Sequence, residues 1–119
     1  MSRIDILCSD PAHPVNLSLE RWAETHATEH DVAILRDRDD LRGGDFLFLI
    51  SCHQIIGKSH RARYRHALVI HASDLPQGRG WSPMIWDVLA GADQICVSLL
   101  NAEDEVDSGA IWQKRRFSL

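Results

Sequence analysis

Short apolar runs, separated by polar stretches that contain Pro, Gly or Ser, recur along the chain. Runs with the length of β-strands occupy residues 4–8, 31–35, 46–50, 67–70 and 94–100. The run at 46–50 is continuous rather than alternating, which is typical of a strand covered on both faces in a parallel sheet. A further short strand is predicted at residues 110–112. The pattern therefore predicts several strands that share one open sheet.

Apolar residues at helical spacing lie between these runs. Asn16 is placed to cap a helix that continues to about His26. A second helix is predicted over residues 54–64, although Gly57 weakens it, and a third starts near Pro83. Strands that alternate with helices predict an α/β protein.

We therefore expect a three-layer, mainly parallel open sheet. The chain has 119 residues, which is the size of one domain. We expect a single domain over residues 1–119, without a C-terminal domain. A chain of this length buries a smaller share of its surface than a larger domain does, which leaves room for a homodimer.

Composition and charge exclude some classes of partner. The formal net charge is −4, which argues against a nucleic-acid partner. A locally basic segment at residues 58–66 either meets an anion or forms a solvated helix face. No apolar run approaches the length of a membrane span, and the N-terminus lacks the features of a signal peptide, so we expect no membrane partner. The three cysteines lack metal-ligand spacing and are interpreted as small buried residues in a reducing cytoplasm, without a metal site.

Candidate chemistry follows the run at 67–70. His71 stands at the carboxyl end of this run, where open α/β sheets place their functional residues. An imidazole takes or gives a proton near neutral pH, and a carboxylate beside it orients the ring. Asp107, in Val106-Asp107-Ser108-Gly109, is the candidate partner. From the residues alone, a structural histidine and a solvated loop carboxylate are the alternatives.

The stretch His71-Ala72-Ser73-Asp74-Leu75-Pro76 is followed by Gly80, Pro83, Trp86, Gly91 and then Val106-Asp107-Ser108-Gly109. In this order and spacing, these residues resemble the formyltransferase family. The resemblance covers roughly residues 45–112. The residues of these motifs are most similar to those of the branch that formylates amino sugars of nucleotide sugars. It implies a Rossmann-like formyltransferase fold, here reduced in size, and 10-formyltetrahydrofolate as the formyl donor.

The resemblance also implies roles for individual residues. The family's catalytic histidine and aspartate fall on His71 and Asp107, which would handle the protons as an amine attacks the formyl carbon. The segment that lines the folate pocket falls on Ser51, Cys52, His53, Gln54, Ile55 and Ile56. On the substrate side we expect Ser73, Arg79, Gly80 and Trp81. An anionic folate tail or a substrate phosphate would meet Arg79 or the basic segment 58–66.

One position departs from the family pattern. The family has an asparagine two residues before the catalytic histidine, and this chain has Val69 there. Valine cannot donate a hydrogen bond to a developing oxyanion, so another donor must act if the chain is an enzyme. The leading interpretation is an N-formyltransferase for an amino sugar of a nucleotide sugar. The alternatives are a formyltetrahydrofolate hydrolase and a non-catalytic domain that binds folate or a partner.

Overall fold

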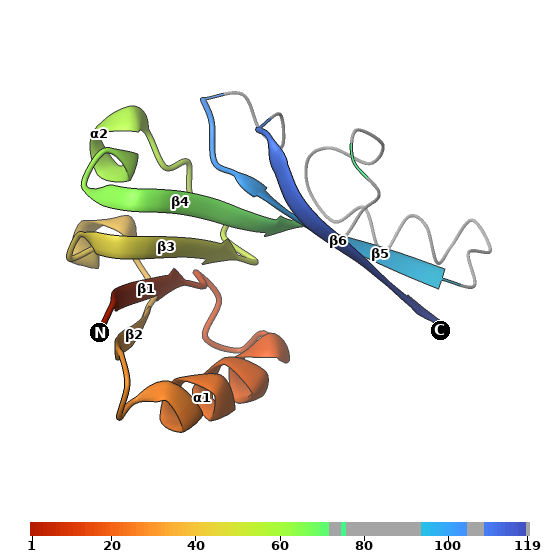
Figure 1. The fold of residues 1–119 in the computed structure, drawn as a ribbon, viewed down its shortest axis with the longest axis horizontal. Coiled ribbons are helices and arrows are strands. Elements are labelled where there is room, and N and C mark those ends of the chain that lie inside the picture. Colours follow the sequence, from red (N-terminus) through yellow and green to blue (C-terminus); the bar gives the residue numbers. More distant parts are fainter. Residues whose placement is uncertain (72–74, 76–93, 105–108, 119) are drawn as a thin grey trace. The chain divides into compact units, whose positions relative to one another are not determined.

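The structure, a computed structural model, describes residues 1–71, 75, 94–104 and 109–118. It divides into two units, Met1–Leu68 and Val69–Leu119. The described strands form a six-stranded sheet in the order β2-β1-β3-β4-β5-β6 (Figure 1). The organisation as a single domain stays a prediction.

The first unit alternates strands and helices. Its elements in chain order are β1 (Arg3–Leu7), α1 (Val15–His26), β2 (Asp31–Leu35), the 3₁₀ helix η1 (Arg38–Asp40), β3 (Gly44–Ile50), α2 (Lys58–Arg61) and most of β4 (Tyr64–His71). The second unit contains the end of β4, followed by β5 (Gln94–Asn101) and β6 (Ile111–Ser118).

The α/β class is confirmed, and the sheet is mixed. β1 pairs in parallel with β2 on one side and with β3 on the other, with Ile4 opposite both Val32 and Phe46. β3 and β4 are neighbours and run in the same direction (Figure 1). β5 and β6 pair antiparallel, so the expectation of a mainly parallel sheet holds for the first unit and not for this hairpin.

Helix α1 covers one face of the first unit's strands. Ile4, Ile6, Cys8 and Leu19 form a buried cluster on this face. Further apolar side chains pack against the cluster: Val15, Val32, Ile34, Phe46, Phe48 and Ile50. Leu47 and Leu49 alternate with the two phenylalanines along β3 and are also buried. The continuous apolar run therefore reflects burial of β3 on both faces, as predicted.

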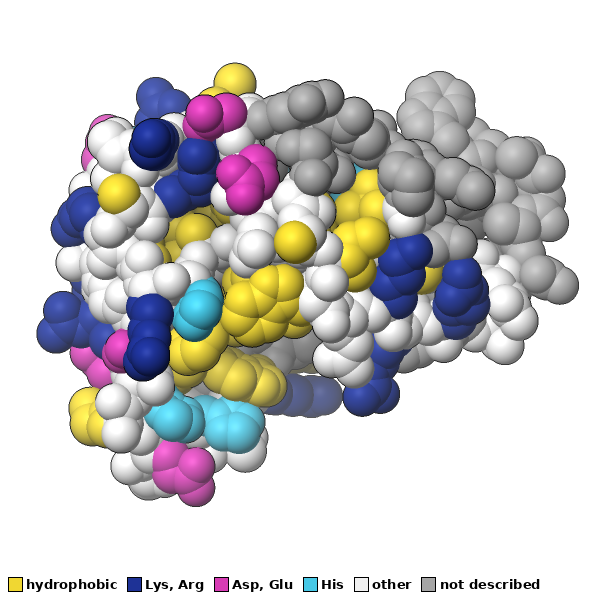
Figure 2. Space-filling view, turned by 45° about the horizontal axis from the view of Figure 1, so that its top comes forward, with side chains coloured by type: hydrophobic (Ala, Val, Ile, Leu, Met, Phe, Trp, Pro, Cys, Tyr) yellow, Lys and Arg dark blue, Asp and Glu magenta, His cyan; other side chains and the backbone are white. Residues whose placement is uncertain are grey.

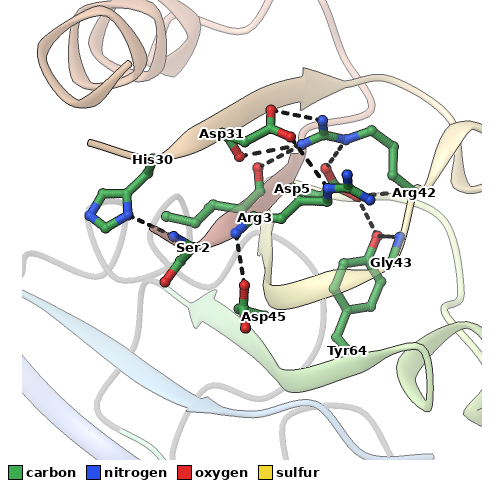
Figure 3. Close-up of polar contacts among 10 residues, drawn as sticks. Ser2, Arg3, Asp5, His30, Asp31, Arg42, Gly43, Asp45 and Tyr64 are labelled. Carbon is green, nitrogen blue, oxygen red and sulfur yellow. Dashed lines mark hydrogen bonds and ion pairs between the residues drawn. The ribbon is translucent and has the colours of Figure 1, made fainter. Parts of the chain in front are cut away.

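A buried carboxylate interrupts this apolar interior. Asp5 is 0% exposed, and Arg42 donates to it through Nε at 2.6 Å and through its main-chain N–H at 2.9 Å. The Tyr64 hydroxyl donates to the same carboxylate and accepts a hydrogen bond from the Gly43 N–H at 3.0 Å (Figure 3). A buried charge is costly unless it is paired and hydrogen-bonded, and here three donors satisfy it.

Arg42 extends this network to the start of β2. Its Nη1 binds the Asp31 carboxylate at 2.9 Å, and Arg3 binds the other oxygen of that carboxylate at 3.3 Å (Figure 3). The hydrogen bond from Arg42 lowers the pKa of Asp31. Burial opposes the charge on Arg42, but hydrogen bonds to Asp31 and Asp5 outweigh it and raise the pKa of Arg42. The network therefore joins β1, β2 and the entry to β3.

Three local predictions are corrected. Asn16 does not cap α1, because the helix begins at Val15 after Pro14 and the Asn16 side chain serves the preceding loop. The helix predicted over 54–64 is reduced to the four residues of α2, since Gly57 is extended at ψ 173°. The strand predicted at 110–112 becomes the eight-residue β6, because pairing with β5 imposes an extended backbone on its polar residues.

Candidate active site

The carboxyl ends of β1 and β3 form the switch point of the first unit. From β1 the chain moves outward to β2 and then returns to the other side of β1 as β3. In open α/β sheets, ligands bind outside the carboxyl ends of the strands at such a point. The loop that starts at Cys8 and the predicted folate segment 51–56 both leave the sheet here.

One hydroxyl joins these two loops. Ser9 Oγ accepts a hydrogen bond from the main-chain N–H of His53 at 2.8 Å and donates to the carbonyl of Ser51 at 3.4 Å. Ser51 itself has a φ of 50°, a left-handed conformation that is uncommon for a residue with a side chain. The chain therefore turns sharply as it leaves β3, and Ser9 holds it in that turn.

Gln54 ties the same segment to the loop after β2. Its Oε1 accepts from the Arg38 N–H at 2.8 Å, and its Nε2 donates to the Asp37 carboxylate at 3.0 Å. Arg38 returns a hydrogen bond to the carbonyl of Ile55 at 3.1 Å. The N–H of Asp39, followed by the Gln54 amide, lowers the pKa of Asp37. Gln54, predicted to bind the cofactor, thus uses its amide to shape the segment.

Ile55 is the exposed apolar side chain of this segment. Ile55 is 72% exposed, whereas Ile56 is buried and its carbonyl accepts from Arg61 at 2.8 Å. Cys52 is half-buried, and burial raises the pKa of its thiol. A neutral thiol is a poor nucleophile, so this environment does not favour covalent chemistry at Cys52.

A second amide organises the loop after β1, and sequence reasoning missed it. Asn16 Nδ2 donates to the carbonyls of Asp10 and His13, both at 2.9 Å. The guanidinium of Arg36 donates to Asn16 Oδ1 and, at 3.3 Å, to the Cys8 carbonyl. The sequence signal for this contact was Asn16, a polar residue among the apolar positions at the start of a helix. Its partner, Arg36, is a charged residue directly after β2.

His71 lies in the second unit and is the last residue of β4. It is 8% exposed, and β4 lies between β3 and β5 in the strand order. The structure confirms the prediction that His71 stands at the carboxyl end of its strand. Val69 stands two residues earlier and is partly buried. Since side chains alternate along a strand, Val69 and His71 point to the same side. The position two residues before the histidine therefore faces the same surroundings as the imidazole.

Several predicted site residues lie outside the described residues: Asp107, Ser73, Arg79, Gly80 and Trp81. The same holds for the predicted convergence of His71 with Asp107, for the loop at 78–83 and for the helix after Pro83. These stay predictions.

The basic segment 58–66 does not form one helix face. Its first residues lie on α2, where Arg61 is committed to the Ile56 carbonyl, and its last residues lie on β4. The His66 ring stacks on Phe46, with centroids 5.4 Å apart. On the face drawn in Figure 2, Lys and Arg side chains are interspersed with acidic and uncharged ones.

Among the described residues, no group of three or more His, Cys, Asp or Glu side chains is placed to hold a metal ion. Within the same part of the chain, no helix is long and apolar enough to cross a bilayer.

Comparison with known proteins places these observations in a family. The sequence profile described as Formyl transferase matches residues 8–118. The methionyl-tRNA formyltransferase of Sorangium cellulosum (strain So ce56) is 31% identical over 75 residues, which cover 62% of this chain and 24% of that protein. The chain spans 22% to 28% of the length of the curated relatives it matches.

Two solved structures share the fold. HypX from Aquifex aeolicus, in complex with tetrahydrofolic acid, matches with a TM-score of 0.78 at 25% identity, covering 99% of this chain and 22% of HypX. The formyltransferase PseJ from Anoxybacillus kamchatkensis matches with a TM-score of 0.71 at 20% identity, covering 98% of this chain and 61% of PseJ. PseJ was solved with UDP-4,6-dideoxy-4-formamido-L-AltNAc and tetrahydrofolate, and the likeness to it concerns the fold alone.

Proposed function

Because the chain belongs to the formyl transferase family, we propose that it transfers a formyl group from 10-formyltetrahydrofolate to a primary amine. The observation that carries this proposal is the family match over residues 8–118, which extends through both units. The folate ligands of HypX and PseJ support a folate donor. In the transfer, the amine nitrogen bonds to the formyl carbon as the bond from that carbon to the folate nitrogen breaks. One proton leaves the amine and one reaches the folate nitrogen.

His71 and Asp107 are the residues proposed to handle these protons. His71 ends a strand and is almost fully buried, and a strand end is a fixed position from which to reach a substrate. The imidazole takes the proton of the attacking amine, and the Asp107 carboxylate orients the ring and stabilises its charged form.

The segment from Ser51 to Ile56 is proposed to hold the donor. Its main chain is held by Ser9, and the Gln54 amide attaches it to the loop after β2. The exposed Ile55 side chain offers an apolar surface to a flat ring. When bound, 10-formyltetrahydrofolate supplies the formyl group. The chain's own residues supply position and proton transfer.

An amino sugar of a nucleotide sugar is the proposed acceptor. The stretch from His71 to Pro83 resembles the sugar-modifying branch, and the ligand of PseJ is a UDP-linked formamido sugar. Ser73, Arg79, Gly80 and Trp81 are the proposed contacts to this substrate. The aminoacyl group of methionyl-tRNA is a second candidate, favoured by the relative in Sorangium cellulosum.

Catalysis needs a direct test because Val69 stands where the family resemblance implies an asparagine. Without an amide at this position, the oxyanion donor must be Ser73, the His71 ring or a main-chain N–H at a strand end. A hydrolase that passes the formyl group to water and a domain that binds folate without turnover are the competing functions.

The deciding experiment incubates the full chain with 10-formyltetrahydrofolate and one acceptor at a time. The acceptors are UDP-4-amino-4,6-dideoxy-L-AltNAc, methionyl-tRNA and water alone. Released tetrahydrofolate is measured by absorbance and the formylated product by mass spectrometry. Formylated sugar supports the proposal, formylated methionyl-tRNA supports the second candidate, and folate release in water alone indicates a hydrolase. Calorimetric binding of tetrahydrofolate without any turnover indicates a binding domain, and neither binding nor turnover overturns the folate assignment.

A further inference from the structure

The loop after β1 reaches the proposed donor segment, residues 51–56, through the side chain of Ser9. The Ser9 hydroxyl accepts from the His53 N–H at 2.8 Å and donates to the Ser51 carbonyl at 3.4 Å, so it binds the main chain on both sides of Cys52. Ser51 has a φ of 50°, a conformation that costs free energy in a residue with a side chain and persists where the surroundings impose it. Ser9 supplies two hydrogen bonds that favour this conformation.

Ser9 is itself held in place, because the carbonyls of both its neighbours in the chain are bound. The Arg36 guanidinium donates to the Cys8 carbonyl at 3.3 Å, and the Asn16 amide donates to the Asp10 carbonyl at 2.9 Å. Arg36 also donates to the side-chain oxygen of Asn16. Since the main chain around Ser9 is already ordered, its hydroxyl loses little conformational entropy when it binds the donor segment.

Asn16 has little freedom to change these contacts. Its side chain is 7% exposed, and its amide also donates to the His13 carbonyl at 2.9 Å. The amide therefore uses both hydrogens and its oxygen in the interior of the first unit. Arg36 directly follows β2, so three side chains connect the end of β2, the loop after β1 and the segment after β3.

We propose that Ser9, Asn16 and Arg36 are positioning residues for the formyl donor. Arg36 and Asn16 hold the loop after β1, and Ser9 transmits this order to residues 51–53. This inference rests on the proposed function, which assigns segment 51–56 to the donor. When only a fraction of the protein has the binding conformation, the apparent affinity is reduced by that fraction, so loss of these contacts weakens donor binding. None of the three side chains is required to touch the donor.

Ser9→Ala removes the hydroxyl and tests its role directly. We expect the calorimetric Kd of tetrahydrofolate to rise about 10-fold, because two hydrogen bonds that preorganise the donor segment are lost. The KM for 10-formyltetrahydrofolate rises likewise, whereas kcat at saturating donor stays at its wild-type value, since donor binding restores the segment. Ser9→Thr keeps the hydroxyl and restores the Kd. Ser18→Ala, the matched control at an exposed serine of α1, leaves the Kd unchanged.

A double-mutant cycle tests whether Asn16 acts through Ser9. Asn16→Asp keeps the size of the side chain and the acceptor for Arg36, but it replaces the amide hydrogens by an oxygen that faces two carbonyls. We expect this change alone to raise the Kd of tetrahydrofolate about 5-fold. The double variant should have the Kd of Ser9→Ala alone, because residues in one hydrogen-bond network do not contribute additively. Should Asn16→Asp fail to fold, Arg36→Lys takes its place in the cycle.

The amide proton of His53 reports on the donor segment itself. It is hydrogen-bonded to Ser9, so its NMR chemical shift is expected to move upfield in Ser9→Ala and in Asn16→Asp. In Ser9→Thr and Ser18→Ala the shift is expected to stay close to that of the wild type. A shift in Asn16→Asp would show directly that the order of the loop after β1 reaches the donor segment.

Each outcome decides the inference. If the wild type binds tetrahydrofolate and Ser9→Ala keeps its Kd, the positioning role is wrong and the proposed function stands. If the wild type does not bind tetrahydrofolate, the donor assignment and this inference fall together. A double variant whose loss is the product of the two single losses would show that Asn16 acts independently of Ser9, which overturns the connection. A fall in kcat at saturating donor as large as the rise in Kd would indicate a general structural defect and would also overturn the inference.

Discussion

Arg42 binds the buried carboxylate of Asp5 twice, through Nε at 2.6 Å and through its main-chain N–H at 2.9 Å. The two residues are 37 positions apart in the sequence. This pair sets where the chain turns into β3, since Arg42 stands two residues before the strand begins at Gly44. The candidate site lies at the carboxyl ends of β1 and β3, whereas this buried ionic contact lies between the middle of β1 and the residue two positions before β3.

Asp5→Asn is expected to destabilise the protein by about 2 to 4 kcal/mol. The substitution keeps the shape but removes the charge that compensates the Arg42 guanidinium, and breaking a buried pair is costly. The free energy of unfolding is measured in urea. Asp45→Asn is the matched control, because Asp45 accepts one exposed hydrogen bond, and it should cost about 1 kcal/mol or less. Equal effects at the two positions would contradict a special role for Asp5.

The raised pKa of Tyr64 predicts that the free energy of unfolding falls at alkaline pH. Burial, together with the Asp5 carboxylate, raises the pKa of Tyr64 to about 12 from 10.0. The folded protein therefore keeps a proton that the unfolded chain has already lost. Its contribution to stability is complete below pH 10 and is lost as the pH rises toward 12. The difference in unfolding free energy between wild type and Tyr64→Phe should shrink over this interval, and a constant difference would refute the assignment.

Gln54→Leu is expected to weaken tetrahydrofolate binding about 10-fold. The change removes two hydrogen bonds that hold the segment 51–56, at about 1 kcal/mol each, part of which appears as lost preorganisation. Isothermal titration gives the Kd. Gln113→Leu, at an exposed glutamine of β6, is the matched control and should bind like the wild type. A Gln54 variant with wild-type affinity would remove this segment from the folate site.

His71→Asn and Asp107→Asn should each keep the fold and the affinity for tetrahydrofolate, but lose formyl transfer. The expected fall in kcat is about 100- to 10,000-fold, as is typical when general acid–base catalysis is removed. Circular dichroism and titration control for folding and binding. Wild-type turnover by both variants would refute the proton-transfer roles.

Val69→Asn restores the residue that the family carries at this position. We expect turnover to stay the same or to rise, because the amide adds a donor on the side of β4 that carries His71. Steady-state kinetics with the acceptor found active gives the comparison. A large loss, with folding intact, would show that the apolar side chain itself is needed.

Periodicity alone predicted the elements whose apolar residues are continuous. The strand at Asp31–Leu35 matches the predicted run, and β3 extends the predicted run 46–50 by two residues at its start. His71 at the end of β4 also followed from the order of apolar and polar residues. These features are local, because strand length and burial follow from the pattern of apolar and polar residues that are neighbours in the sequence.

Contacts between distant residues decided the rest. Asp5 looks like an ordinary polar position, and its buried state depends on Arg42 and Tyr64, which lie 37 and 59 residues away. Residues 54–56 were predicted to be helical. Instead, the Gln54 side chain is hydrogen-bonded to Asp37 and Arg38, and the short helix α2 begins only at Lys58. The sequence predicted only a short strand at residues 110–112, and β6 continues to Ser118 because β5 supplies its hydrogen-bond partners. Pairing energy and burial come from the folded chain, so no local pattern encodes them.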